Sequence, residues 1–276
     1  MQTILRQTRA EYREAVAAVA RGDAASGLAR LDALGWVTEG DTITRNQALV
    51  QDYLAALSAG KTALIVAPTH CEGGAATRLV RRALQAAGRL STDEHVVTAL
   101  RDVRLTEAEK ADPYRYRLGM VVEFHQHARA IKSGTRLRVT RIDDLGRVVG
   151  TDARGRTHAL PLDTPARFTV YEPQALPLAV GDQVRITRNS LSLDGHKLAR
   201  GNVYRLAGFT PAGDLLIEAG CERWCVSAGH GHLAHGYVAT SYAAQGRTVD
   251  QVFLLQTAES LPASWKYQNF RVWPVG

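Results

Sequence analysis

Short apolar runs separated by turn residues fill the middle of the chain, from about residue 115 to residue 233. Aspartate and glycine mark the breaks between them, at residues 143–146, 194–195 and 212–214. Strands of this length, joined by turns of this kind, are typical of small antiparallel barrels. The pattern predicts strands over residues 120–124, 137–142, 147–151, 167–170, 183–187, 203–209 and 215–218.

Both ends of the chain have the pattern of an α/β protein. Apolar residues at helical spacing, with Thr44 as a cap, predict helices over residues 10–20, 24–34, 45–58 and 75–87. Compact apolar runs of the kind found in parallel sheets predict strands over residues 62–67, 237–240 and 251–256. The simplest account is an α/β domain interrupted by a β-rich module, with parts at residues 1–112, 113–233 and 234–276.

Composition and charge narrow the class of protein. Among the 276 residues there is no apolar run of about 18 residues, so no membrane span is expected. The first six residues lack the apolar core of a signal peptide, and three cysteines suit a reducing compartment, so a cytoplasmic protein is predicted. The net charge is +7, and residues 112–171 hold 11 Lys+Arg against 6 Asp+Glu. This local excess fits contact with a polyanion or, equally, a solvated Arg-rich surface.

Gly60-Lys61-Thr62 resembles the end of a phosphate-binding loop, but the rest of that loop is missing. The loop needs a further glycine five residues before Gly60 and a helix after the lysine. Position 55 is alanine, and a strand is predicted to follow. We therefore interpret Gly60 as the residue that ends the preceding helix.

Cysteines and histidines gather near the end of the β-rich region. Thiolate and imidazole are ligands that zinc prefers, so a zinc site is chemically possible. The spacing is not that of a common finger or ribbon, and we favour the interpretation of small core residues with loop histidines. The residues concerned are Cys221, Cys225, His230, His232 and His235.

Residues 236–250 predict a strand, a polar turn, the start of a helix and a second strand. This arrangement presents backbone N–H groups and hydroxyls to a phosphate. The residues Thr240-Ser241-Tyr242-Ala243-Ala244-Gln245-Gly246 resemble motif V of superfamily 1 DNA helicases of the RecD-like branch. Tyr242 stands where that motif usually has histidine, and an aromatic ring there could still stack on a base.

The resemblance extends over residues 1 to about 264. The segment Ala67-Pro68-Thr69-His70 is similar to a segment of the second motor domain in MobF-type conjugative relaxase-helicases, the TraI/TrwC-like family. Segments 4–7, 12–16, 31–35, 181–189 and 232–236 also fit that family. The resemblance implies a partial RecA-like parallel sheet, with the β-rich middle as an SH3-like insertion.

The same resemblance implies roles for single residues. Arg6 would reach the γ-phosphate of ATP, and Gln245, Gly246 and Thr248 would face the nucleotide cleft. Single-stranded DNA would be held at the sheet and, through basic side chains, on the inserted module. The residues implied for DNA are Thr69, His70, Thr240, Ser241, Tyr242, Arg129, Lys132, Arg136 and Arg138.

The resemblance also shows what this sequence lacks. The phosphate loop, the acidic Mg²⁺ motif and motif III of the family are not found, and residues 265–276 do not match motif VI. A chain without the phosphate loop and Mg²⁺ carboxylate cannot position ATP for hydrolysis, so it is not expected to be an ATPase alone. ATP and Mg²⁺ would serve only the intact family protein, and another chain could supply the first motor domain.

Two hypotheses of different class follow. The first is a helicase fragment, truncated at both ends, that binds single-stranded DNA with no cofactor of its own. The second is a noncatalytic module that binds a protein partner and exposes an apolar face where the first motor domain would have packed. A zinc-binding domain is a third and weaker possibility.

Overall fold

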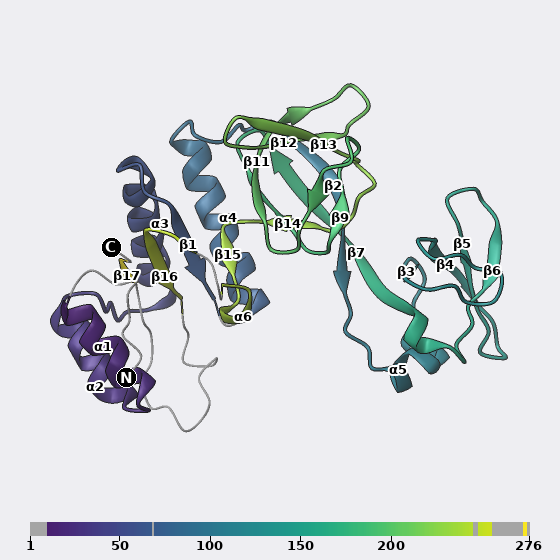
Figure 1. The fold of residues 1–276 in the computed structure, drawn as a ribbon, viewed down its shortest axis with the longest axis horizontal. Helices are drawn as coiled ribbons and strands as arrows, with labels where there is room; N and C mark the ends of the chain where they lie inside the picture. The colour runs from purple at the N-terminus through teal and green to yellow at the C-terminus, as the bar shows by residue number, and fades with distance from the viewer. Residues whose placement is uncertain (1–9, 68, 245–247, 256–272, 275–276) are drawn as a thin grey trace.

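The computed structural model describes residues 10–67, 69–244, 248–255 and 273–274. It shows a mixed α/β protein with a small, mainly parallel sheet and several antiparallel sheets. Figure 1 shows three parts in a row: an α/β part around β1, a β region around β11 and β12, and a second β region around β3 to β6. No helix in the described ranges is long and apolar enough to cross a membrane.

The α/β part is built on the strand order β15-β1-β16-β17. Strand β1 (Ala63–Val66) pairs in parallel with β15 (Val238–Ala239) and with β16 (Gln251–Leu254), while β17 (Trp273–Pro274) is antiparallel to β16. The predicted strands at these places are confirmed in position and are shorter than expected. The sequence pattern thus identified a parallel sheet made from segments far apart in the chain.

Two long helices cover one face of this sheet. Helix α3 (Thr42–Ser58) begins at the cap Asp41, whose carboxylate accepts from the backbone N–H of Thr44 at 2.7 Å. The prediction that Thr44 is the cap is therefore wrong, because the stronger acceptor three residues earlier starts the helix. Gly60 follows the helix with a φ of +72°, as expected for a residue that ends it.

Helix α4 (His70–Ala86) begins five residues before the predicted start at residue 75. Thr69 caps the helix, Gly73 and Gly74 lie within it, and Gly73 faces β15 closely. A Cβ atom at Gly73 would lie 3.2 Å from a side-chain carbon of Val238, so the glycine permits close packing of helix on strand.

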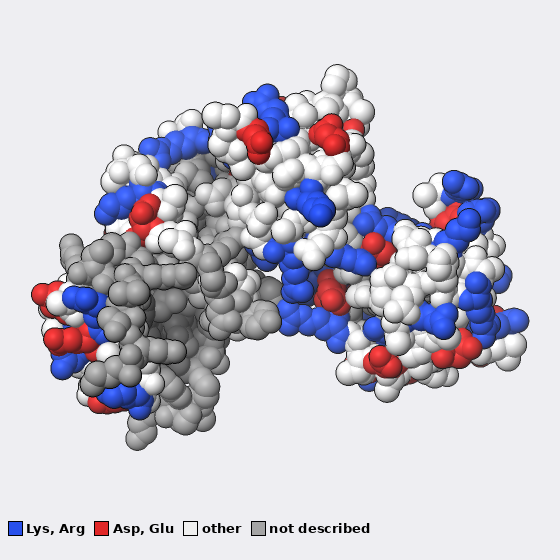
Figure 2. All heavy atoms as spheres, viewed as in Figure 1, with Lys and Arg blue, Asp and Glu red and all other residues white. Residues whose placement is uncertain are grey.

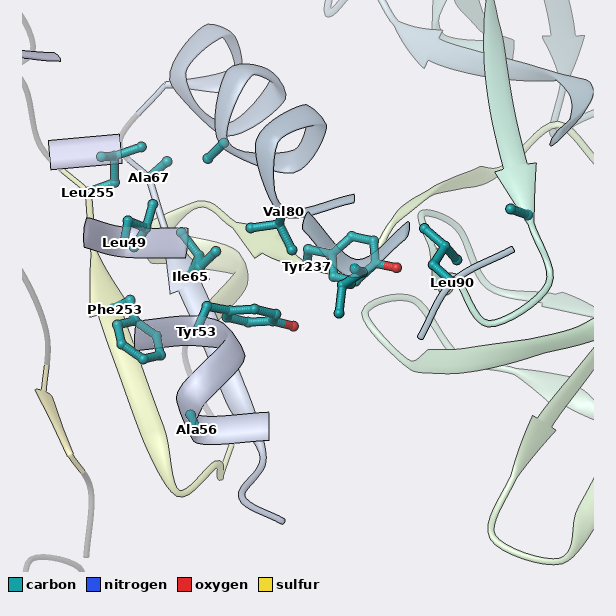
Figure 3. Close-up of a cluster of buried hydrophobic side chains, with 13 residues drawn as sticks. Leu49, Tyr53, Ala56, Ile65, Ala67, Val80, Leu90, Tyr237, Phe253 and Leu255 are labelled. Carbon is teal, nitrogen blue, oxygen red and sulfur yellow. The ribbon is translucent and has the colours of Figure 1, made fainter. Parts of the chain in front are cut away.

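The apolar core of this part lies between the two helices and the sheet (Figure 3). Tyr53 of α3 is fully buried and packs against the rings of Phe253 and Tyr237. Ile65 of β1 and Val80 of α4 complete the contact. Before this part come α1 (Ala10–Ala20) and α2 (Ala24–Ala33), two helices at the predicted positions, and they pack on each other.

A long two-stranded ribbon links the remaining parts. Its strands are β2 (Glu94–Asp102) and β7 (Phe168–Ala179), which pair along all nine residues of β2. The sequence did not predict β2, and it predicted only the first residues of β7. The continuation of β7 through Pro173 and Pro177 was missed because proline removes a donor and normally argues against a paired strand.

We call the β region next to α4 the near module. Its sheet has the order β13-β12-β11-β8-β14. Its core combines these strands with Val97, Leu176 and Leu178 of the ribbon. The strands are β8 (Gln183–Ile186), β11 (Val203–Phe209), β12 (Leu215–Ala219), β13 (Glu222–Val226) and β14 (Leu233–His235), with a hairpin of β9 (Ser190–Leu191) and β10 (Lys197–Leu198).

The other β region is the far module. It extends the ribbon into a six-stranded sheet of order β2-β7-β3-β4-β5-β6. The elements of the far module are α5 (Glu107–Ala111), η1 (Pro113–Arg115), β3 (Val121–Phe124), β4 (Arg136–Ile142), β5 (Val148–Thr151), β6 (Thr157–Ala159) and η2 (Pro165–Arg167).

Among the described residues, neither the near module nor the far module closes into a barrel. The finer prediction of a small barrel is therefore not part of the observed fold.

The antiparallel region is longer than the predicted 113–233. Strand β2 begins at Glu94, and β14 reaches His235 while pairing with β8. The division of the chain into domains remains a prediction. In the structure, antiparallel pairing runs from Glu94 to His235, and β15 follows three residues later.

A buried ion pair joins the near module to the α/β part. The carboxylate of Asp182, fully buried, accepts two hydrogen bonds of 2.9 Å from the guanidinium of Arg81 on α4. The hydroxyl of Tyr237 and the backbone N–H of Ala179 donate to the same carboxylate at 2.8 and 2.7 Å. Because every oxygen of this carboxylate is satisfied, the pair fixes α4 against the near module.

Candidate nucleic-acid interface

The carboxyl ends of β1 and β15 lie side by side. Val66 pairs with Ala239, and the backbone N–H of Ala67 donates to the carbonyl of Ala239 at 2.9 Å. Thr69 follows the first strand and Thr240 the second, so the fold brings these two threonines to one edge of the sheet. Ligands of α/β proteins bind at this edge, outside the carboxyl ends of the strands.

Thr69 caps α4 at this edge. Its hydroxyl accepts from the backbone N–H of Glu72 at 3.2 Å and donates to the Glu72 carboxylate at 2.7 Å. The side chain is exposed, as a ligand contact requires. His70 is the first residue of α4, and its side chain is outside the described part of the structure.

Thr240 stands at the start of the short helix α6 (Ser241–Ala244). The backbone N–H of Ala244 donates to the Thr240 carbonyl at 2.9 Å, and that of Ala243 donates to its hydroxyl at 3.4 Å. The predicted order of strand, turn and helix start is confirmed here. Ser241 and Tyr242 form the first turn of α6, but their side chains are not described.

The nucleotide-facing positions are mostly outside the described residues. Arg6, Gln245 and Gly246 all fall there, so the structure neither places nor separates them. Thr248 is described and exposed. Two residues later, Asp250 accepts from both the backbone N–H and the hydroxyl of Thr62 at 2.7 Å, which anchors this turn to the start of β1.

The four basic residues predicted on the inserted module lie in the far module, away from the two threonines (Figure 1). Lys132 and Arg138 are exposed, and neither has an acidic partner among the described residues. Arg129 is exposed but forms an ion pair with Asp163 at 2.7 Å. The predicted DNA residues therefore lie in two separate regions, one at the sheet edge and one in the far module.

Arg136 differs from the other three. Its guanidinium donates to the backbone carbonyls of Gly229 and His230, both at 2.8 Å, and lies 3.3 Å from a carboxylate oxygen of Glu123. These bonds join β4 of the far module to a loop of the near module. The structure places Arg136 in the joint between the modules, where its charge is paired with that of Glu123.

Lysine and arginine side chains gather around that joint and over the far module (Figure 2). At the centre of the joint lies Glu123, which sequence reasoning did not identify. Burial opposes its ionisation, but the His232 hydrogen bond and the Arg136 charge hold the pKa of its carboxyl below the usual range. Glu123 and His232 are 109 residues apart, so no local signal links them.

His230 lies beside this cluster. Its Nε2 is 2.8 Å from the hydroxyl of Ser190, and its ring lies 5.9 Å from that of His232. Burial, followed by the charges of His232 and Arg136, lowers the pKa of His230 to about 4. The imidazole is therefore neutral at pH 7.

The cysteines and histidines considered for zinc have separate surroundings. His230 and His232 belong to the joint, and Nε2 of His235 lies 2.9 Å from the carbonyl of Pro177. Cys221 is exposed and precedes β13, which contains Cys225. The described ranges hold no group of three or more His, Cys, Asp or Glu side chains placed to bind a metal.

Comparison with known proteins adds no relative. A scan against protein-family models finds no match for this sequence, and a search of curated proteins finds no similar sequence.

Proposed function

We propose that this chain binds single-stranded DNA as part of a RecD-like helicase of the MobF type, corresponding to the second, RecA-like motor domain with an SH3-like insertion. The observation that carries this proposal is the pairing of β1 with β15, which puts Thr69 and Thr240 at neighbouring strand ends. Hydroxyls and helix starts at such an edge suit the phosphates of a nucleic-acid strand. The resemblance of residues 240–246 to motif V supports the same assignment.

The described residues do not fit ATP by themselves. Gly60 ends α3, and β1 begins at Ala63, so no helix follows Lys61 to cradle a phosphate. We therefore propose no ATP hydrolysis by this chain alone. Turnover of ATP belongs, in this proposal, to an assembly in which another chain supplies the missing phosphate loop and Mg²⁺ ligands.

The far module supplies the second contact with the strand in this proposal. Lys132 and Arg138 are exposed cations of this module with no acidic partner among the described residues, and each phosphate contact made by such a residue releases a counterion. Binding through these residues is independent of base sequence.

Replacing both residues, Lys132→Ala with Arg138→Ala, is expected to weaken binding of a fluorescent oligonucleotide about tenfold near 0.1 M salt. The slope of the logarithm of affinity against the logarithm of salt concentration should become shallower by about 1.4. Two phosphate contacts are lost, and each contributes about 0.7 to that slope. Fluorescence anisotropy across a salt series measures both quantities.

A matched control removes two other exposed arginines. Arg147 and Arg156 already pair with Asp143 and Asp152 of their own turns, at 2.7 and 2.8 Å. Their double alanine variant changes the net charge by the same amount and should weaken binding much less. Equal losses in the two double variants would show that only net charge matters, and would remove the far-module contact from the proposal.

A further inference from the structure

Three donor groups from two modules converge on one buried carboxylate. Glu123 of β3 accepts from Nε2 of His232 at 2.7 Å and lies 3.3 Å from Nε of Arg136 through the same oxygen. Its other oxygen lies 3.0 Å from a guanidinium nitrogen of Arg188. Arg136 comes from the far module, and Arg188 and His232 come from the near module. The carboxylate thus occupies a site at the joint whose three donors are arranged to bind an anion.

The donors are held in place by other contacts as well. Two nitrogens of Arg136 donate to backbone carbonyls of the segment 229–230, and Arg188 donates to the hydroxyl of Tyr171 at 3.3 Å. The ring of His232 packs edge-on against Tyr171. These contacts do not depend on Glu123, so the donors would keep their directions if the carboxylate left.

Carboxylates and phosphodiesters are interchangeable ligands for such a site. Each carries one negative charge on two oxygens, and arginine recognises both with paired N–H donors. Both arginine side chains in the joint are 33% exposed, so water and solutes reach the edge of the site.

We propose that the joint is a binding site for a phosphate group of a single-stranded nucleic acid, and that the Glu123 carboxylate closes it in the unbound protein. Binding is then an exchange in which a phosphodiester replaces Glu123 at Arg188 and His232. The nucleic-acid part of this inference rests on the proposed function, whereas the anion site itself does not.

The connection between the modules allows such an exchange. The two paired strands of the ribbon connect the core of the near module to the core of the far module. Along this stretch Thr98, Gln174 and Ala175 are exposed. The contacts that hold Glu123 across the joint are polar, and Leu100, Val121 and Tyr171 of the far-module sheet form a small apolar cluster beside them. Polar contacts between domains of one chain separate more readily than apolar ones.

The direct test uses inorganic phosphate as the probe for Glu123→Ala, with isothermal titration calorimetry as the readout. We expect one phosphate per chain, bound at least tenfold more tightly than by the unchanged protein. Adding Arg188→Ala to this variant should abolish the gain. A folded Glu123→Ala protein that binds phosphate no more tightly than the unchanged protein would overturn the anion site.

The control is Glu172→Ala, which removes an acidic residue from the ribbon with the same change in net charge. Glu172 pairs with Arg101, and its side chain points to the opposite face of the ribbon from that of Tyr171, so its loss should leave phosphate binding unchanged. Should Glu123→Ala unfold in circular dichroism, Glu123→Gln replaces it, because the amide keeps the size of the side chain and removes its charge. A tighter phosphate complex is expected for it too, and no gain in the folded amide variant would equally overturn the site.

A labelled single-stranded oligonucleotide forms the second arm. Glu123→Gln should raise its affinity severalfold more than Glu172→Gln does. Tighter phosphate binding without tighter oligonucleotide binding would keep the anion site and reject its use for nucleic acid. Failure of all variants and of the unchanged protein to bind the oligonucleotide, with phosphate binding intact, would instead reject the proposed function.

Discussion

Replacing Asp182 with alanine is expected to lower the free energy of unfolding by about 3–5 kcal/mol, the usual cost of removing one partner from a buried ion pair. The change leaves the guanidinium of Arg81, whose side chain is only 8% exposed, without its bidentate acceptor. It also removes the acceptor of the buried Tyr237 hydroxyl. Urea unfolding of both proteins at pH 7 measures the difference.

Glu94 provides the control for this variant, because it is the second carboxylate on Arg81. It lies 2.9 Å from the same guanidinium, but its side chain is 35% exposed. Glu94→Gln should therefore cost less than about 1 kcal/mol. If Asp182→Ala were no more destabilising than Glu94→Gln, the buried pair would not be what holds α4 to the near module.

Acidification is expected to destabilise the protein through His230. Its pKa is about 4 in the folded state against an ordinary value of 6.5, so the unfolded chain binds more protons between these values. Stability is then complete above pH 6.5 and is lost as the pH falls towards 4. From pH 7 to pH 4.5 the loss from this residue is about 2 kcal/mol.

His230→Gln isolates this contribution. The glutamine amide can reach the Ser190 hydroxyl but does not titrate, so the variant should lose about 2 kcal/mol less than the unchanged protein over the same pH range. Urea unfolding at the two pH values gives both losses. Identical pH dependence in the two proteins would contradict the assignment to His230, because the remaining titratable groups of the joint, Glu123 and His232, are present in both.

Elements with a strong local pattern could be predicted from the sequence. The helices α1 and α2 and the strands β1, β11 and β16 lie where apolar spacing placed them. Strand β2 was missed for two reasons. The strand that pairs with it, β7, follows more than 60 residues later, and the exposed side chains of β2 include both charged residues and the apolar Val96. Its burial depends on that pairing, which no local pattern shows.

The candidate site, too, could be predicted from the sequence only in part. The local pattern predicts that Thr69 and Thr240 each follow a strand, whereas their placement at neighbouring strand ends depends on the pairing of β1 with β15. The role of Arg136 could not be predicted, because its partners are Glu123 and a loop more than 90 residues away. A basic residue in a strand looks the same in sequence whether it faces solvent or a buried carboxylate.

The central proposal, binding of single-stranded nucleic acid, is tested most directly by titrating a fluorescent oligonucleotide with the unchanged protein over a range of salt concentrations. A strand held by phosphate contacts predicts a logarithm of affinity that falls linearly with the logarithm of salt concentration. With Lys132 and Arg138 in contact, the slope should be about −1.4 or steeper. No binding at the lowest salt concentration, or an affinity that does not change with salt, would contradict the proposal.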